Sequence, residues 1–318
     1  MKYTEKQIYD IIRREDMKKY NACINILSSR DRCLPLCVRS LWDNWNYRYD
    51  YPVYVHYFDD IYDDPKLRKD ILAYTKSDVR FISIPYETPK WIPEDQLFYN
   101  RQDLWYVNTG RFGKHRKGYL HMTNFYNNTY GYPNTELHNY DYYLQVDDES
   151  HFLKEVPYNF FEVLDGRPEL AGAIKVTHAK DKRPHQGNFD CRVGMWDHIK
   201  NYIEKYNITP GSKFIRDLLE DPDAETNFHE KSTADSYIFK TELFRTPEWQ
   251  QWNKALNESG GCYTGRWGDD ELNYLFFLIH HDYPVYDFKT VDEGYHSQGG
   301  LKSICKQYYA PSIKEFDR

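Results

Sequence analysis

Long apolar runs are missing from this 318-residue sequence. No stretch approaches the roughly 18 consecutive apolar residues that a membrane-spanning helix needs, and we therefore expect no integral membrane segment. The segment Met1–Tyr20 is charged throughout and lacks the apolar core of a secretory signal. Both absences lead us to expect a cytoplasmic or otherwise soluble protein.

Metal-type cysteine spacing and phosphate-binding loops are also missing. The six cysteines form no CxxC pair, so free thiols in a reducing compartment are the simplest interpretation. Neither GxGxxG nor GxxxxGKS/T follows any predicted strand, which argues against dinucleotide and P-loop nucleotide sites. The formal net charge of −7 argues against nucleic acid as the main partner.

Strands and helices alternate in the first part of the chain. β-Branched and aromatic runs predict strands at Asn21–Leu27, Pro52–Phe58 and Val79–Ile84. Helices predicted at Leu34–Trp45 and Asp64–Tyr74 separate them. Strand, helix and strand in this order indicate an α/β fold with a parallel sheet and helices on its faces. The length suits one large domain or two closely joined ones.

The stretch Tyr140–Phe152 is the most informative part of the sequence. It begins with the alternation of a strand and then breaks into three consecutive carboxylates, Asp147, Asp148 and Glu149. Adjacent acids repel one another, and carboxylates in a loop after a strand are suitable ligands for Mg²⁺ or Mn²⁺. An acidic surface turn without a metal would have the same sequence.

Two groups of basic residues are placed where they could meet an anion. Arg30 follows the first strand, and ligands of open α/β sheets bind beyond the carboxyl ends of strands. The cluster Arg111–Lys117, which includes Arg116, is basic in an otherwise acidic chain. Both groups could contact a diphosphate, and both could equally be solvated surface residues. The 31 tyrosines and eight tryptophans suit sugar binding as well as packing.

A second unusual stretch, Ser259–Glu271, combines a glycine-rich turn with Arg, Trp and acidic residues. It leads into an apolar helix predicted at Leu272–Ile279, near whose N-terminus the carboxylate of Asp269 is favoured by the helix dipole. A helix cap with an acidic first turn explains the carboxylates. It leaves the turn Arg266–Gly268 unexplained.

Three stretches in this order resemble the fungal α-1,2-mannosyltransferase family, glycosyltransferase family 15. They are the strand ending in Val146–Glu149, the turn Ser259–Asp269 and the late Gly294-Tyr295-His296. The turn is the most specific, because the family carries Ser-Gly-Gly-x-Tyr-x-x-Arg-Trp-Gly-Asp there. Tyr119–Met122 is similar to the family's Tyr-Arg-His-Met segment. The resemblance spans most of Tyr20–Gly300.

The resemblance implies a GT-A glycosyltransferase fold, an α/β architecture with a Rossmann-like mixed sheet flanked by helices. It also implies Mn²⁺ (or Mg²⁺) as the cofactor and GDP-mannose as the donor substrate. Asp147 takes the place of the family's metal-binding Glu, Glu149 that of the following Asp, and Asp148 that of a Pro. His296 matches the metal-ligand His, which is compatible with Mn²⁺.

The resemblance also assigns catalytic residues. Tyr119 matches an active-site Tyr, and Asp269 is the Asp of the Trp-Gly-Asp turn. The family's proposed nucleophile is a Glu shortly before the strand predicted at Asp235–Phe239. Counting back from that strand gives Ser232, and Glu230 is the nearest carboxylate that could substitute.

On this interpretation the donor is bound by Arg30, Arg116, Lys117 and Asp147, and the rings of Tyr and Trp residues, Trp267 among them, stack on sugars. The metal would neutralise the diphosphate as it leaves. Asp269 or Asp270 would position or deprotonate the acceptor hydroxyl. The expected partners are a sugar-nucleotide donor and a glycan or glycoprotein acceptor.

We expect residues 1–19 to form an N-terminal helical extension and residues 20–318 a single GT-A-like catalytic domain. Its nucleotide-binding half would cover about residues 20–152, and its acceptor half about residues 153–318. Family members carry an N-terminal membrane anchor in the Golgi, and since this sequence shows none, a soluble protein is the stronger expectation than a lumenal one.

Three alternatives remain open at this stage. The same fold could use a UDP-sugar, because donor specificity lies in loops outside the motifs. The chain could also be a non-catalytic glycan- or nucleotide-binding descendant, since the nucleophile position holds no acid. A metal-dependent hydrolase would need a second-metal cluster, which the sequence does not provide.

Overall fold

The computed structural model describes residues 18–28, 33–58, 60–110, 117–129, 136–174, 177–179, 191–222, 224, 231–233, 236–281, 285–288 and 296–298. The expected N-terminal helix lies almost wholly outside these ranges. No helix in the described ranges has both the length and the apolar character to cross a membrane.

A seven-stranded mixed sheet forms the centre of the molecule, in the order β10-β6-β9-β4-β1-β2-β3. Its strands are β1 (Ala22–Leu27), β2 (Val53–Tyr57), β3 (Val79–Ser83), β4 (Tyr142–Asp147), β6 (Ala171–Ile174), β9 (Ser236–Lys240) and β10 (Tyr286–Asp287). Strands β4, β1, β2 and β3 run parallel, whereas β9 is antiparallel to both β4 and β6. Two short antiparallel pairs lie outside this sheet. They are β5 (Ser150–Phe152) with β11 (His296–Gln298), and β7 (Thr177–Ala179) with β8 (Lys231–Thr233).

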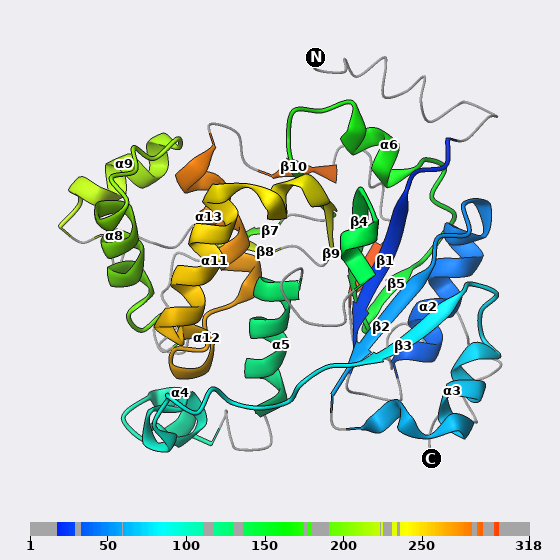
Figure 1. Cartoon of the computed structure of the whole chain (residues 1–318), viewed down its shortest axis with the longest axis horizontal. Helices are drawn as coiled ribbons and strands as arrows, with labels where there is room; N and C mark the ends of the chain where they lie inside the picture. Colours follow the sequence, from blue (N-terminus) through cyan, green and yellow to red (C-terminus); the bar gives the residue numbers. More distant parts are fainter. Residues whose placement is uncertain are drawn as a thin grey trace.

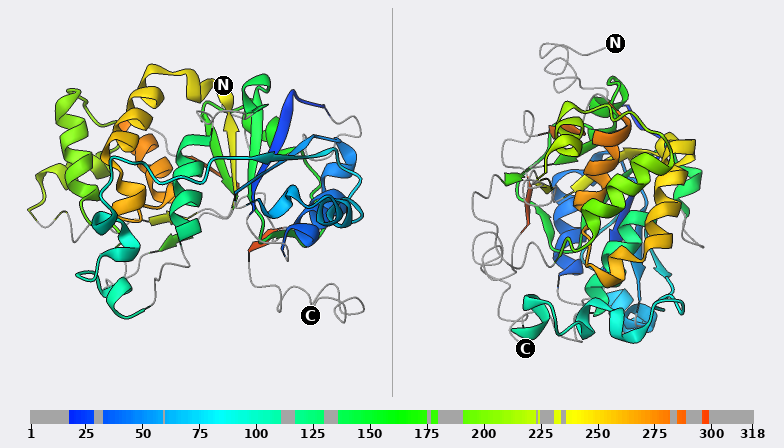
Figure 2. Two further views of the ribbon diagram at one scale, coloured as in Figure 1. Left: turned by 60° about the horizontal axis from the view of Figure 1, so that its bottom comes forward. Right: turned by 90° about the vertical axis from the view of Figure 1, so that its left-hand side faces the viewer.

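Helices cover both faces of the sheet. They are α2 (Leu34–Asn44), α3 (Pro65–Leu72), α4 (Trp105–Asn108), α5 (Lys117–Asn128), α6 (Phe160–Asp165), α8 (Met195–Lys205), α9 (Lys213–Glu220), α11 (Pro247–Ser259), α12 (Gly261–Thr264) and α13 (Asp269–His280). Among the 3-10 helices, η7 (Glu136–Asn139) and η8 (Thr241–Arg245) border a pocket described below. Figures 1 and 2 show α2 and α3 on one side of the sheet and α8, α9, α11 and α13 on the other.

The alternation of side chains along the strands explains the two layers. Ile24 and Ile26 of β1 face the cluster that contains α2, α3 and α6, while Cys23 faces the cluster of α5, α8, α11 and α13. Helix α2 forms because Leu34, Cys37, Val38 and Leu41 recur at helical spacing and are buried. The mixed sheet with helices on both faces confirms the fold class expected from the sequence.

Helix α11 shows how local sequence fixes an element that borders the candidate site. The side chain of Thr246 caps its N-terminus by accepting a hydrogen bond from the Trp249 amide at 3.2 Å, and Pro247 occupies the first turn. The helix ends at Gly260, whose φ of +66° is a left-handed conformation that favours glycine. The predicted glycine-rich turn therefore contains the end of α11 and the short helix α12.

Candidate active site

The acidic stretch lies at the carboxyl end of the central strand β4. Leu144 and Val146 are fully buried, and Asp147 is the last residue of the strand and is partly exposed. Asp147 is paired in register with Leu27, so β1 and β4 end level with each other. This is the edge of a parallel sheet where α/β proteins bind ligands.

Asp148 is the anchor of the acidic turn. Its carboxylate is 2% exposed and accepts a hydrogen bond of 2.7 Å from Ser28 Oγ, at the end of β1. Ser28 Oγ in turn lies 2.7 Å from the hydroxyl of Tyr62. Since Asp148 points inward, Asp147 and Glu149 on either side of it are the partly exposed carboxylates. Asp148 therefore holds the turn by a buried hydrogen bond.

Strand β11 brings the late part of the chain to this turn. It pairs with β5, which begins directly after Glu149, and the backbone of His296 lies opposite Phe152. Phe152 is buried against Trp45, with ring centroids 6.5 Å apart. The side chain of His296 lies outside the described part of the structure. Its backbone is paired with Phe152, which follows Glu149 by three residues.

The donor set at the turn suits a hard divalent cation. Two carboxylates separated by an inward-pointing residue supply oxygen ligands for Mn²⁺ or Mg²⁺. Within the described ranges no group of three or more His, Cys, Asp or Glu side chains could hold a metal ion. A third protein ligand would have to come from a side chain outside them, and β11, which pairs with β5, carries His296.

A second wall of the site is formed by α13 and α5. Asp269 is the first residue of α13 and is partly exposed. Tyr119 lies in the first turn of α5, and the guanidinium carbon of Arg266 sits 4.2 Å from its ring centroid. Burial raises the pKa of Tyr119, Asp269 and Asp270 raise it further, and Arg266 opposes them. Tyr119 therefore interacts electrostatically with Arg266, Asp269 and Asp270.

The contacts of Arg266 and Trp267 explain the residues of the turn Arg266–Gly268. Arg266 adopts a left-handed conformation with φ +53°, which turns the chain so that its guanidinium meets Tyr119 and donates to Cys191 Sγ at 2.7 Å. Trp267 is 4% exposed, and its indole donates a 3.0 Å hydrogen bond to the Val193 carbonyl. A side chain at Gly261 would lie 2.1 Å from the Trp267 ring. The expectation that Trp267 stacks on a sugar is therefore wrong, because its ring is packed inside the protein.

Tyr126 of α5 joins the two walls. Its hydroxyl accepts a 3.3 Å hydrogen bond from the Leu27 amide at the end of β1. Burial raises the pKa of Tyr126, and Asp147, Asp148 and Asp269 raise it further. The acidic turn and the start of α13 therefore lie within electrostatic reach of the same phenol, although 122 positions separate Asp147 from Asp269 in the chain.

Glu271 has a different role from Asp269. Its carboxylate forms a mostly buried ion pair with Arg192 and accepts a 2.8 Å hydrogen bond from Arg192 Nε. This pair ties α13 to the segment that precedes α8. Of the three acids in the first turn of α13, Asp269 is the one whose charge is felt by both Tyr119 and Tyr126.

The remaining predicted site residues divide into two sets. Lys117 begins α5, and its ammonium lies 5.1 Å from the ring centroid of Tyr86. Arg30, Arg116 and Glu230 lie outside the described residues. Glu230 directly precedes β8, and β8 lies against α13, the helix that begins with Asp269.

Comparison with known proteins identifies the family. The sequence profile of a family described as glycolipid 2-alpha-mannosyltransferase matches residues 2–278. Two curated relatives from Saccharomyces cerevisiae are similar to the chain. The probable mannosyltransferase KTR2 is 21% identical over 87% of this chain and 68% of its own length. The probable mannosyltransferase YUR1 is 23% identical over 75% of this chain and 56% of its own length.

Solved structures share the fold. Core-mannan synthase A (CmsA/Ktr4) from Aspergillus fumigatus, in an Mn/GDP form, aligns with a TM-score of 0.66 and 18% identity over 96% of this chain and 87% of its own. The mannosyltransferase Ktr4p from S. cerevisiae, in complex with GDP, aligns with a TM-score of 0.65 and 17% identity over 83% of this chain and 68% of its own. The fold expected from the sequence is thus the fold of these enzymes, and the chain is a glycosyltransferase that belongs to the glycolipid 2-alpha-mannosyltransferase family.

Proposed function

We propose that this protein is a metal-dependent retaining glycosyltransferase that moves mannose from GDP-mannose onto a hydroxyl of a glycan. One observation carries the proposal. Asp147 and Glu149 are partly exposed on either side of the anchored Asp148, at the carboxyl edge of the parallel strands β1 and β4. The Mn/GDP form of the A. fumigatus relative supports the same donor base and metal.

One set of residues is proposed to bind the metal and the leaving diphosphate, and a second set is proposed to act on the sugar and the acceptor. Asp147 and Glu149, with His296, would hold Mn²⁺ or Mg²⁺, which when bound neutralises the diphosphate as it leaves. Arg30, Arg116 and Lys117 are proposed to contact the same diphosphate through their cationic groups. The hydrogen bond from Ser28 to Asp148 would keep the two outer carboxylates in place without rearrangement during the reaction.

Asp269 and Tyr119 are proposed to act on the sugar side. Asp269 lies at the N-terminus of α13, and it is proposed to position the attacking hydroxyl or to accept its proton. The guanidinium of Arg266 lies over the Tyr119 ring, with its central carbon 4.2 Å from the ring centroid. Glu230 is proposed as the carboxylate that stabilises or attacks the anomeric carbon, as in retaining glycosidases.

Sugar-nucleotide hydrolysis gives a direct test of the donor. With Mn²⁺ present, we expect GDP-mannose to be hydrolysed about tenfold faster or more than UDP-glucose and UDP-galactose, because base and sugar contacts discriminate at the transition state. The measurement is nucleoside diphosphate release without an acceptor, and the same panel with EDTA is the control.

Two results would reject the proposal in different ways. Preferential hydrolysis of a UDP-sugar would keep the fold and the reaction and change the donor. Thermal stabilisation by GDP and Mn²⁺ without turnover of any donor would identify a non-catalytic descendant that only binds the nucleotide.

A further inference from the structure

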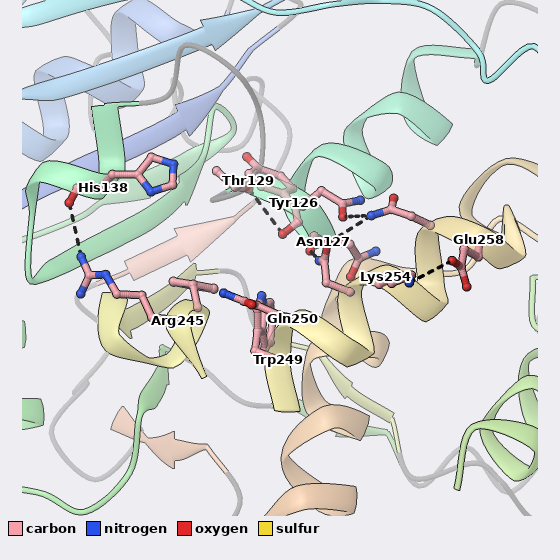
Figure 3. A pocket seen from close by; sticks show the side chains of 13 residues that line it. Tyr126, Asn127, Thr129, His138, Arg245, Trp249, Gln250, Lys254 and Glu258 are labelled. Carbon is pink, nitrogen blue, oxygen red and sulfur yellow. Dashed lines mark hydrogen bonds and ion pairs between the residues drawn. The ribbon is translucent and has the colours of Figure 1, made fainter. Parts of the chain in front are cut away.

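A pocket of about 670 Å³ lies at the carboxyl end of α5 (Figure 3). It is bordered by the end of α5, by η7, by η8 and by one side of α11. The lining residues are Tyr126, Asn127, Asn128, Thr129, His138, Phe244, Arg245, Trp249, Gln250, Asn253, Lys254, Asn257 and Glu258. None of them belongs to the set assigned to donor or metal.

Side-chain amides dominate the polar part of this lining. Asn253 Nδ2 donates to the Asn127 carbonyl at 2.6 Å, and Asn257 Nδ2 donates to Asn128 Oδ1 at 2.6 Å. These bonds align the amides of α11 with the end of α5. Gln250 and Asn257 stay exposed on the rim, while Asn127 and Asn128 form a buried floor.

Asn127 carries an acceptor that the protein leaves unused. Its side chain is 2% exposed and donates through Nδ2 to the Thr123 carbonyl at 2.9 Å. Within the described part of the chain, Asn127 Oδ1 is buried and has no hydrogen-bond partner. Because this oxygen is covered by protein atoms, a ligand in the pocket would bind the exposed amides of the rim and not Asn127 Oδ1.

Much of the remaining lining consists of aromatic rings and of charged side chains that have partners within the protein. Phe244 and Trp249 are buried with ring centroids 5.0 Å apart in an edge-to-face arrangement. Lys254 lies 3.8 Å from Glu258, and Arg245 Nη2 donates to the His138 carbonyl at 3.3 Å. A diphosphate or an acidic peptide would need a denser cationic lining. A purely apolar ligand would leave the amides desolvated without partners.

An exposed indole extends this surface past the end of α11. Trp91 is 57% exposed, and its ring lies against Gly260, where an added side chain would come within 2.7 Å of it. Gly260 follows Glu258 of the pocket by two residues. Exposed Trp faces and neighbouring amides together are the groups that bind the apolar and hydroxyl faces of sugar rings.

The pocket and the candidate active site are neighbours that share Tyr126 and have otherwise different residues. Tyr119 and Asn127 are eight residues apart on α5, which is about 12 Å along the helix axis. His138 precedes β4, and Asp147 ends it. The strand from Tyr142 to Asp147 spans about 16 Å. The lining contributed by η7 therefore lies toward the amino end of β4, whereas Tyr126, whose hydroxyl accepts from the Leu27 amide, lines the pocket and reaches the edge that carries the acids.

We propose that this pocket is a second carbohydrate site, which binds a neutral oligosaccharide by its vicinal hydroxyls. Only the choice of mannose as the sugar rests on the proposed function. A glycan held there would keep an acceptor chain on the enzyme while one of its ends reaches the transfer site, and the two weak contacts would reinforce each other.

The test uses an α-linked mannotriose as the probe, with EDTA present and no donor. Calorimetric titration of the full chain is expected to show binding that becomes about tenfold weaker when Gln250→Ala and Asn257→Ala are combined, because two hydrogen bonds to the ligand are lost. Both residues are exposed on α11, and alanine favours helix there. Gln96→Ala, an exposed glutamine outside the pocket, is the matched control and should bind as the wild type does.

The outcomes separate this proposal from the transferase proposal. Asp147→Ala should retain mannotriose affinity while it loses transfer, since no residue of the acidic turn lines the pocket. No binding by the wild type, or unchanged affinity in the Gln250 and Asn257 double variant, would overturn the second site. Complete displacement of mannotriose by GDP with Mn²⁺ would overturn it as well, because the probe would then occupy the donor site.

Discussion

Replacing Asp147 with alanine is expected to lower the rate of mannosyl transfer by about a thousandfold or more, because stabilisation of the leaving diphosphate by a bound metal is worth several kcal/mol. Asp147 ends the strand at the sheet edge and is one of two exposed carboxylates beside the anchored Asp148. The measurement is initial transfer rate from GDP-mannose to a mannose disaccharide, with Mn²⁺ varied.

Asp141→Ala is the matched control for this variant. Asp141 is an exposed acid directly before the same strand, so its loss changes the charge of the protein equally without touching the turn. It should keep the wild-type rate. Full activity of Asp147→Ala in EDTA would reject the metal assignment.

Replacing Trp267 with alanine is expected to lower the free energy of unfolding by about 3–5 kcal/mol, the usual cost of removing a buried aromatic ring. The indole fills the space over Gly261 and Gly265 and donates a 3.0 Å hydrogen bond to Val193. Its removal leaves a cavity and an unpaired carbonyl. Urea unfolding followed by circular dichroism gives the measurement.

Trp91→Ala controls for the loss of an indole as such. Trp91 is 57% exposed, so its loss should cost about 1 kcal/mol or less. If Trp267→Ala unfolded like the wild type and instead raised KM for the acceptor, the ring would be a sugar-stacking group after all, and the packing described for it would be wrong.

The central strands could be predicted because the local pattern matches the tertiary role, whereas their order in the sheet was not predicted. β1 and β4 are buried on both faces and are mostly apolar or aromatic, with Asn25 and Gln145 as buried polar exceptions, which is typical of the middle of a parallel sheet. Helix α12 was not predicted, because three glycines within Gly260–Gly265 indicate a turn and not a helix. They are needed partly because the Trp267 ring packs directly on Gly261 and Gly265.

The parts of the candidate site that depend on contacts between distant segments could not be predicted from the sequence. The exposed carboxylates Asp147 and Glu149 could be singled out because three adjacent acids after a strand are unusual. The anchoring of Asp148 by Ser28 could not, since the partners are 120 residues apart. The position of Tyr126 between the two walls depends on how α5 packs between the sheet and α13, and no periodicity in the sequence carries that information.

The most direct measurement is a crystal structure of the full chain with GDP and Mn²⁺, in which the metal is located by its anomalous scattering. The arrangement at the end of β4 predicts one manganese peak within coordination distance of Asp147 and Glu149 carboxylate oxygens and of the GDP diphosphate, about 2.1–2.3 Å for such oxygen ligands. GDP bound without any manganese at this turn, or a peak held by other side chains, would contradict the proposed site.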